Sequence, residues 1–241
     1  MAVERFHQDD VARELHEIGI FWATVKGGYK EAQTSYARAL ERIERSGLDE
    51  VSAKVQSARI IRDGAFADAR QAAAERSLAP LDKSEEALRS SLKLISLLYD
   101  MYPSTRFSPE AWRFLSSEYG ATVSMLGRAA TLRAVIAPGD NHGRESLDQA
   151  AKNYWTAHEE YLKKGSNRYY EASNGVNAAR NEVLAGRLSN AAAWLVRASS
   201  SAAVAGLADR PNFKNAFATV TARLPGLTSK QAAAASVVAR P

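Results

Sequence analysis

The chain has 241 residues, 46% of them hydrophobic, which is enough to bury the core of one long domain or of two smaller ones. It contains no cysteine, so disulfides and thiolate metal sites are excluded and a reducing compartment suits it. The net charge of +5 is uneven, because residues 160–241 hold 11 Lys/Arg against 4 Asp/Glu and the remainder is nearly balanced.

The start of the chain, MAVERFHQDDVARELHE, contains no apolar run of signal-peptide length, and no run of about 18 apolar residues follows it. We therefore expect a cytoplasmic protein that does not enter a membrane. Abundant alanine favours close-packed helices over sheets, and apolar residues recur at i, i+3 and i+4 rather than in alternation. The sequence therefore predicts an all-α fold.

Glycine and proline divide the sequence into about ten helical segments. We expect helices near residues 8–26, 29–46, 48–63, 65–79, 82–102, 109–137, 144–164, 167–185, 188–207 and 211–224. Two helix starts carry signals: Ser108 precedes Pro109 and an acid, and Asp82 with Glu85 has the spacing of a capping box. The final segment, 227–241, lacks bulky residues to anchor it, so we expect a poorly ordered tail.

Four helix pairs repeat one spacing of small and large residues. Small residues allow close approach of two helices, and large residues fill the space beside the neighbouring pair. The aligned positions are Leu15, Ile18, Gly19, Trp22, Tyr29, Ala32, Tyr36 and Ala39 in the first pair, Ala53, Ser57, Ile60, Gly64, Phe66, Ala69 and Ala73 in the second, Trp112, Leu115, Ser116, Tyr119, Leu147, Ala150, Tyr154 and Ala157 in the third, and Ala179, Gly186, Ala191, Leu195 and Ala198 in the fourth.

This arrangement resembles the tetratricopeptide repeat (TPR), although no copy keeps the closing proline and the third copy is split between Tyr119 and Leu147. The resemblance implies antiparallel helix pairs stacked side by side as a short TPR-like α-solenoid, because one pair alone cannot bury its apolar face. We expect one repeat domain over residues 1–226 and leave open a subdivision near residues 103–108.

A narrower resemblance covers residues 109–186. The segments PEAWRFLSSEYG, LDQAAKNYWTAHEEYLKKG and RYYEASNGVNAARNEVLAG resemble the helical-repeat region called the TRAF-binding domain of apoptosis signal-regulating kinases and the related repeats of bacterial multidomain proteins. After its paired tyrosines the chain has Glu171–Ala172–Ser173, where the family pattern has proline or glycine. The resemblance implies a protein-interaction module of a signalling or defence assembly rather than a catalyst.

The sequence contains no recognisable catalytic motif: no glycine-rich phosphate loop, no nucleophile elbow and no paired zinc-binding histidines. His7 and His16 flank two aspartates, but their spacing places them about 180° apart around one helix. The polar stretch PGDNHGRES, residues 138–146, is interpreted as a loop between helices. We therefore expect no enzyme activity, no metal site and no cofactor.

In the repeat register, the first helix of each pair lines an inner groove, where cations and amides suit the carboxylates or backbone carbonyls of an extended peptide. Asn174 and Asn177 share one face of the helix expected over residues 167–185. Asparagine is not favoured inside a helix, so these two need either a partner or an internal hydrogen bond, for example with the preceding segment Tyr169–Tyr170. The predicted groove residues are Arg13, His16, Lys54, Arg113, Asn174, Asn177 and Arg180.

The leading interpretation is a non-enzymatic scaffold that binds a protein or peptide partner, one with acidic groups if the groove cations contact it. The alternative is nucleic-acid binding through the basic residues 160–241, with an affinity that falls steeply with salt. Aromatic residues are few there and no base-reading code repeats. A helical enzyme without a recognisable motif is a third hypothesis. The identity of the partner and the oligomeric state stay open.

Overall fold

The computed structural model describes residues 3, 5–102, 104–138, 141–164, 168–204, 206–207 and 210–224. Nine α-helices form in this part of the chain, which confirms the all-α fold. Within the same residues, no helix has both the length and the apolarity that a membrane span needs. The predicted tail, 227–241, lies outside the described residues.

The helices are α1 (Asp10–Thr24), α2 (Tyr29–Glu44), α3 (Glu50–Glu75), α4 (Leu78–Met101), α5 (Pro109–Ile136), α6 (Asn141–Lys164), α7 (Arg168–Leu184), α8 (Leu188–Val204) and α9 (Pro211–Thr221), with a short 3-10 helix, η1 (Ser104–Arg106), before α5.

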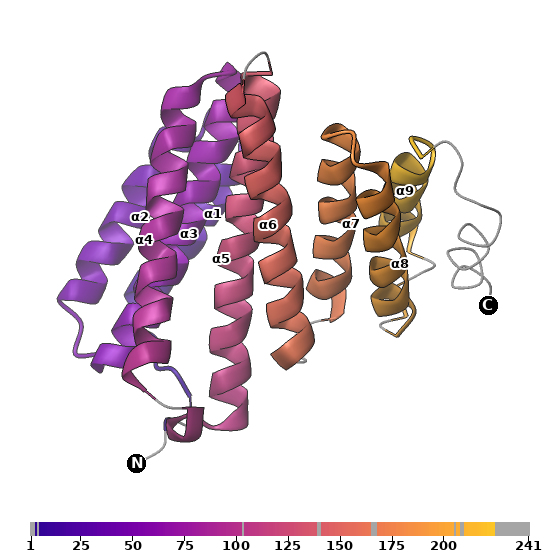
Figure 1. Ribbon diagram of the computed structural model, residues 1–241. Coiled ribbons are helices and arrows are strands. Elements are labelled where there is room, and N and C mark those ends of the chain that lie inside the picture. The colour runs from indigo at the N-terminus through magenta and orange to yellow at the C-terminus, as the bar shows by residue number, and fades with distance from the viewer. Residues whose placement is uncertain are drawn as a thin grey trace.

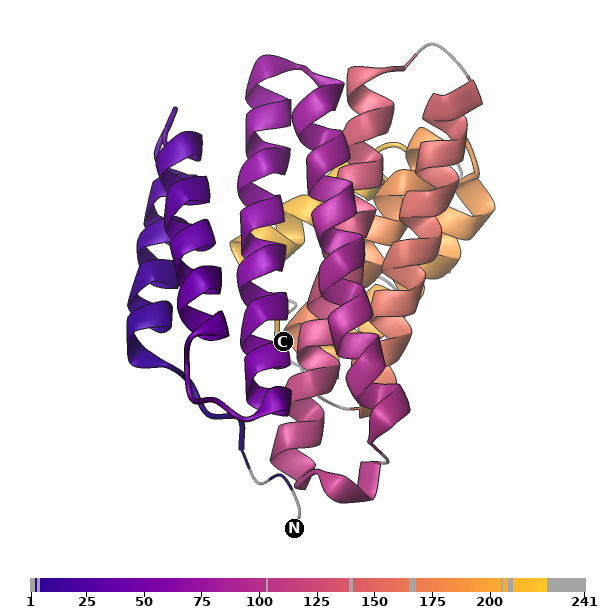
Figure 2. The same cartoon turned by 90° about the vertical axis from the view of Figure 1, so that its left-hand side faces the viewer.

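Helices that are adjacent in the chain pack as pairs. The pairs are α1 with α2, α3 with α4, α5 with α6 and α7 with α8, and each pair contacts the next. Figure 1 shows the chain passing from α1–α4 through α5 and α6 to α7–α9, and Figure 2 shows α1 to α6 running lengthwise beside one another. The first helices of successive pairs also contact each other directly, as α1 does with α3 and α3 with α5.

Glycine opposite tyrosine sets the distance between the helices in two of the pairs. Tyr36 of α2 is buried against Gly19 of α1, where an added Cβ would lie 2.5 Å from the tyrosine Cε1 atom. Tyr154 of α6 is buried against Gly127 of α5, where the corresponding distance to the ring is 3.0 Å. The small and large residues predicted to pack in these second helices therefore do form core contacts. The alanines one turn before and after each tyrosine are buried too: Ala32, Ala39, Ala150 and Ala157.

The second copy of the predicted repeat is wrong, because its residues lie on one helix rather than on two. Helix α3 runs unbroken through Gly64. A glycine inside a helix costs only about 1 kcal/mol relative to alanine, and this one faces Tyr36 at ordinary contact distance, with an added Cβ 3.5 Å from Cδ2. The partner of α3 is α4, which carries Pro80 in its first turn, where a missing N–H is tolerated.

One of the two predicted helix starts is confirmed. Ser108 precedes α5, and its side chain accepts a hydrogen bond from the Ala111 N–H at 3.1 Å. The capping box at Asp82 is wrong, because this residue lies inside α4. Its carboxylate accepts from Arg133 Nη2 of α5 at 2.5 Å, and Glu85 accepts from Arg133 Nε at 2.9 Å. These two acids therefore join α4 to α5.

The segment that precedes α1 crosses to the middle of the chain. Val3 and Phe107 form an isolated parallel β-bridge, and the Ser108 N–H donates to the Val3 carbonyl at 2.8 Å. The His7 N–H donates to Ser52 Oγ of α3 at 3.0 Å. The N-terminal residues therefore tie the start of α1 to α3 and to the connection that leads into α5.

Candidate functional site

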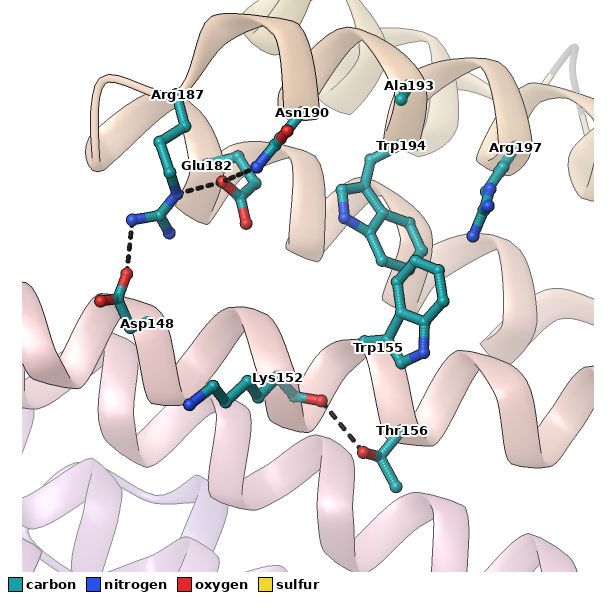
Figure 3. A pocket seen from close by; sticks show the side chains of 10 residues that line it. All are labelled: Asp148, Lys152, Trp155, Thr156, Glu182, Arg187, Asn190, Ala193, Trp194 and Arg197. Carbon is teal, nitrogen blue, oxygen red and sulfur yellow. Dashed lines mark hydrogen bonds and ion pairs between the residues drawn. The ribbon is translucent and has the colours of Figure 1, made fainter.

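A pocket of about 870 Å³ lies between α6 and α8 (Figure 3). Both helices pack against α7, so the pocket is an open recess between the second helices of two neighbouring pairs. Its volume is in the range of pockets that bind small molecules or protruding side chains. The described residues that line it are Asp148, Lys152, Trp155, Thr156, Glu182, Arg187, Asn190, Ala193, Trp194 and Arg197.

Helical periodicity brings these residues to the pocket. Asp148, Lys152 and Trp155 follow one another at i, i+4 and i+7, so they form one stripe along α6. Asn190 and Arg197 are likewise seven residues apart on α8, with a tryptophan between them. Each stripe therefore needs only a regular helix to hold its side chains, and the common packing against α7 places the two stripes around one recess.

One end of the pocket is an ion-pair cluster centred on Arg187. Its guanidinium pairs with Asp148 of α6 and with Glu182 of α7. Asn190 Nδ2 also donates to Glu182 Oε2 at 3.4 Å. The hydrogen bond with Glu182 raises the pKa of Arg187, which keeps the guanidinium charged. Both carboxylates that line the pocket are therefore already neutralised by a cation of the protein.

The other end of the pocket is a pair of tryptophans. Trp155 of α6 and Trp194 of α8 meet edge to face, with ring centroids 4.5 Å apart and an interplanar angle of 78°. Trp194 is 6% exposed and also meets the His158 ring, at 5.4 Å between centroids, whereas Trp155 is 40% exposed. A fixed ring beside an exposed one provides a rigid apolar surface for a ligand.

Two cations of the pocket have no ion-pair partner in the part of the chain that the structure describes. Arg197 makes cation–π contacts with both tryptophans, with Cζ 4.6 Å from the Trp155 centroid and 5.6 Å from the Trp194 centroid. Lys152 is exposed. In Figure 3 the Lys152 side chain points toward the Arg187 end of the pocket, and Arg197 lies on the other side of the tryptophans.

A smaller recess of about 340 Å³ lies between α4 and α6, which are also second helices of neighbouring pairs. Its cations are engaged within the protein. Arg133 pairs with Asp82 and Glu85, and Arg89 pairs with Glu85 at 2.9 Å. This recess therefore offers a ligand less unpaired charge than the α6–α8 pocket does.

The residues predicted from the sequence to line a groove on α1 and α3 are engaged within the protein. Arg13 is exposed and pairs with Asp10 at 3.2 Å. His16 is buried, and its Nε2 lies 2.9 Å from Asp63 Oδ2 of α3. Lys54 pairs with a glutamate one turn before it. Among the described residues, no group of three or more His, Asp or Glu side chains is arranged around a metal position.

The predicted groove residues on α5 and α7 comprise two exposed cations and two amides. Arg113 and Arg180 are exposed. Asn174 is buried and accepts from Ser124 Oγ of α5 at 2.7 Å. Asn177 is half-buried, and its backbone carbonyl accepts a hydrogen bond from Asn181 Nδ2 at 2.9 Å. The internal hydrogen bond considered for Asn174 therefore joins α7 to α5 rather than to the preceding tyrosines.

A buried charge network joins α1, α3 and α5. Arg62 pairs with Asp63 at 2.9 Å and with Glu118 of α5, and Asp63 also contacts His16. Burial alone would raise the pKa of Asp63, but the His16 hydrogen bond and the Arg62 charge lower it to about 2. Because these groups satisfy one another inside the protein, the network holds three first helices together.

None of the seven predicted groove residues lines the α6–α8 pocket. They lie on the first helices α1, α3, α5 and α7, whereas the pocket belongs mainly to second helices. The sequence holds a signal for the pocket that the repeat register does not use. Lys152 precedes Trp155 by three residues and Arg197 follows Trp194 by three, so each cation shares a helix face with a tryptophan.

The chemistry of the pocket is that of binding by stacking and charge. It combines a rigid aromatic surface, two unpaired cations and an internally neutralised acid pair. Both acids among the described residues that line it are held by Arg187. Comparisons of this chain with known protein families, with curated proteins and with solved structures found no match.

Proposed function

We propose that this chain is a cytoplasmic, non-enzymatic scaffold of TPR-like stacked helix pairs that binds a protein or peptide partner in a signalling, regulatory or defence assembly. The α6–α8 pocket carries the proposal, because exposed Trp155 and the unpaired cations Lys152 and Arg197 gather in one open recess. Tryptophan and arginine are the residues that most often dominate the binding energy of protein interfaces. The packing of each helix pair against the next supports the stacked arrangement.

The shape of the pocket supports a chain segment as the ligand. Two helices wall the recess along its length, and its polar groups are spread from the Arg187 end to the tryptophan end. A segment lying along such a recess can contact both ends at once, as peptides do in grooves between helices. A catalytic role has less support, because the two acids, Asp148 and Glu182, form ion pairs with Arg187.

Affinity capture from cells that express the chain tests the proposal. The wild type is compared with a pocket variant, Lys152→Glu with Arg197→Glu, and with a matched control, Arg113→Glu with Arg180→Glu. The control reverses the same number of exposed cations on first helices, outside the pocket. We expect the wild type and the control to retain the same stoichiometric partner and the pocket variant to lose it, because its charge now repels the partner.

Two other results are informative in opposite ways. A partner lost only with the control variant supports a scaffold that uses the sequence-predicted groove and removes the assignment to the pocket. A partner that neither variant affects, or a wild type that retains no stoichiometric partner, contradicts the proposed function. Circular dichroism of all three proteins confirms that the comparison is between folded chains.

A further inference from the structure

We propose that the α6–α8 pocket recognises a peptide segment that carries an apolar side chain between two carboxylates. The apolar side chain covers Trp155, one carboxylate pairs with Lys152 and the other with Arg197. This inference rests on the proposed function and names the chemistry of the partner. It starts from the distribution of charge within the pocket.

The acids that line the pocket pair with Arg187, which leaves its two other cations without a carboxylate partner among the described residues. Its only acids among the described lining residues, Asp148 and Glu182, both bind Arg187 at one end. Lys152 and Arg197 have no ion-pair partner in the described chain, so a ligand with two carboxylates can pair with them without displacing an internal contact. An added anion thus gains attraction at no cost in broken ion pairs.

Arg197 is held in a geometry that suits a carboxylate. Its guanidinium carbon lies within cation–π distance of the Trp155 and Trp194 rings, and no ion pair in the described chain occupies the N–H edges of the guanidinium. The edges remain available for the paired hydrogen bonds that arginine makes with a carboxylate. Trp194 is fixed in turn by burial and by the His158 ring, and Trp155, the ring nearer to Arg197, packs edge to face against it.

The tryptophan pair separates the two cations, which sets the order of groups in the ligand. In Figure 3 Lys152 extends toward one end of the pocket and Arg197 lies beyond the rings at the other. The exposed part of Trp155 lies between them and gains most from an apolar side chain that excludes water. An acidic residue on each side of an apolar one matches this order.

Charge complementarity argues against other occupants. Residues 225–241 of this chain contain Lys230 and Arg240 and no acid, so they repeat the charge of the two open cations. A nucleic-acid strand carries a phosphate at every step, whereas the described lining residues offer unpaired cations at only two positions. A peptide can place its acids at the cations alone.

Selection from a library of short random peptides displayed on phage tests the inference with the full chain as bait. Binders to the Lys152→Gln and Arg197→Gln double variant are removed first, so that selected peptides depend on the two cations. We expect the selected peptides to share an acid–apolar–acid pattern. Fluorescence anisotropy of a labelled selected peptide then gives its Kd for each single variant.

We expect Lys152→Gln, Arg197→Gln and Trp155→Ala each to weaken the peptide by about tenfold or more, since each removes a charge-assisted hydrogen bond or a stacking surface. Arg180→Gln, an exposed cation of α7 outside the pocket, is the matched control and should leave the Kd unchanged. Changing one acid of the peptide to its amide should abolish the effect of one cation variant and spare the effect of the other.

Several results overturn the inference. These are selected peptides without acids, selected peptides that bind the double variant equally well, no selected peptide, or a single-stranded oligonucleotide that binds more tightly and depends on the same two cations. The scaffold proposal is judged separately by affinity capture. A captured partner that depends on the pocket, together with failure of the acidic peptides, means that the partner has another chemistry.

Discussion

Asp68 of α3 is a carboxylate whose surroundings disfavour its charged form. Burial raises its pKa to about 6, and the charge of Lys83 and a hydrogen bond from Gln33 Nε2, 2.8 Å from Oδ1, only partly oppose this. The unfolded chain has the ordinary value of 3.8. Since the folded pKa is the higher one, the stability gained from protonation is complete below pH 3.8 and is lost as the pH rises through about 6.

Replacing Asp68 by Asn should therefore stabilise the protein only on the alkaline side of this window. The amide keeps an oxygen that accepts from Gln33, and it removes the cost of a buried charge. Well above pH 6 we expect a gain in the free energy of unfolding on the order of 1 kcal/mol after solvent screening. Urea titrations of both proteins across the pH range measure this, and a gain that is equal at all pH values would contradict the assigned cause.

The sequence alone does not reveal what an individual polar residue contacts. It assigns His16 and Asn174 to a groove for a partner, whereas the structure buries both against Asp63 and Ser124, which are 47 and 50 residues away. Such a pairing depends on the order in which helices stack. A pattern did exist: Asn174 and Asn181 are seven residues apart on α7, and they accept from Ser124 and Thr131, which have the same spacing on α5.

At the scale of the helices, two glycines that face the same tyrosine have opposite roles. Gly19 of α1 lies so close to Tyr36 that a Cβ would overlap the ring, whereas Gly64 of α3 leaves room for one. The first glycine is required by the contact between α1 and α2. Gly64 lies inside α3, where glycine has a lower helix propensity than alanine, and no close contact requires the missing side chain.

The two alanine substitutions should accordingly change stability in opposite directions. Gly19→Ala should lower the free energy of unfolding by about 1–3 kcal/mol through overpacking against Tyr36. Gly64→Ala should raise it by about 0.5–1 kcal/mol through helix propensity. Urea denaturation followed by circular dichroism gives both values, and equal stability of the two variants would refute the close contact assigned to Gly19.

Helix periodicity and the cap at Ser108 predicted most elements, because these signals are local. The break at Gly64 and the cap at Asp82 were not predictable in the same way. Whether a helix ends at a glycine or continues past it depends on which residues pack against that glycine. Whether an acid caps a helix or pairs with a distant cation depends on where that cation lies in the fold. Gly64 faces Tyr36 and Asp82 binds Arg133, and both partners belong to other helices.

At the scale of the whole molecule, stability should decrease from the middle toward the first pair. Among the described helices, the pair α1–α2 has its main outside contacts with α3, and α1 leaves Phe21 59% exposed, whereas α3 and α4 are packed between two other pairs. In chains where each unit contacts only its neighbours, terminal units open at a lower free energy. We expect hydrogen exchange, measured by mass spectrometry, to be faster in α1 and α2 than in α3 and α4. One common exchange rate for all four helices would indicate a single cooperative unit instead.

The position of the α6–α8 pocket also belongs to this scale. The sequence identifies Trp155 and Trp194 as large residues of second helices, for which core packing is the usual role. That Trp155 stays 40% exposed follows from the separation of α6 and α8 across α7, which no local pattern encodes. The predicted groove differs from this pocket because the repeat register assigns the groove to first helices, whereas the pocket lies between the second helices α6 and α8.

The bridge between Val3 and Phe107 has a consequence for the order of events during synthesis. Val3 leaves the ribosome before α1, yet the backbone it pairs with emerges only after α1 to α4. Those four helices depend mainly on neighbours made just before them, so they can assemble as they appear. The segment before α1 can thus dock only after α1 to α4 have emerged, and its docking joins the start of α1 to the connection that leads into α5.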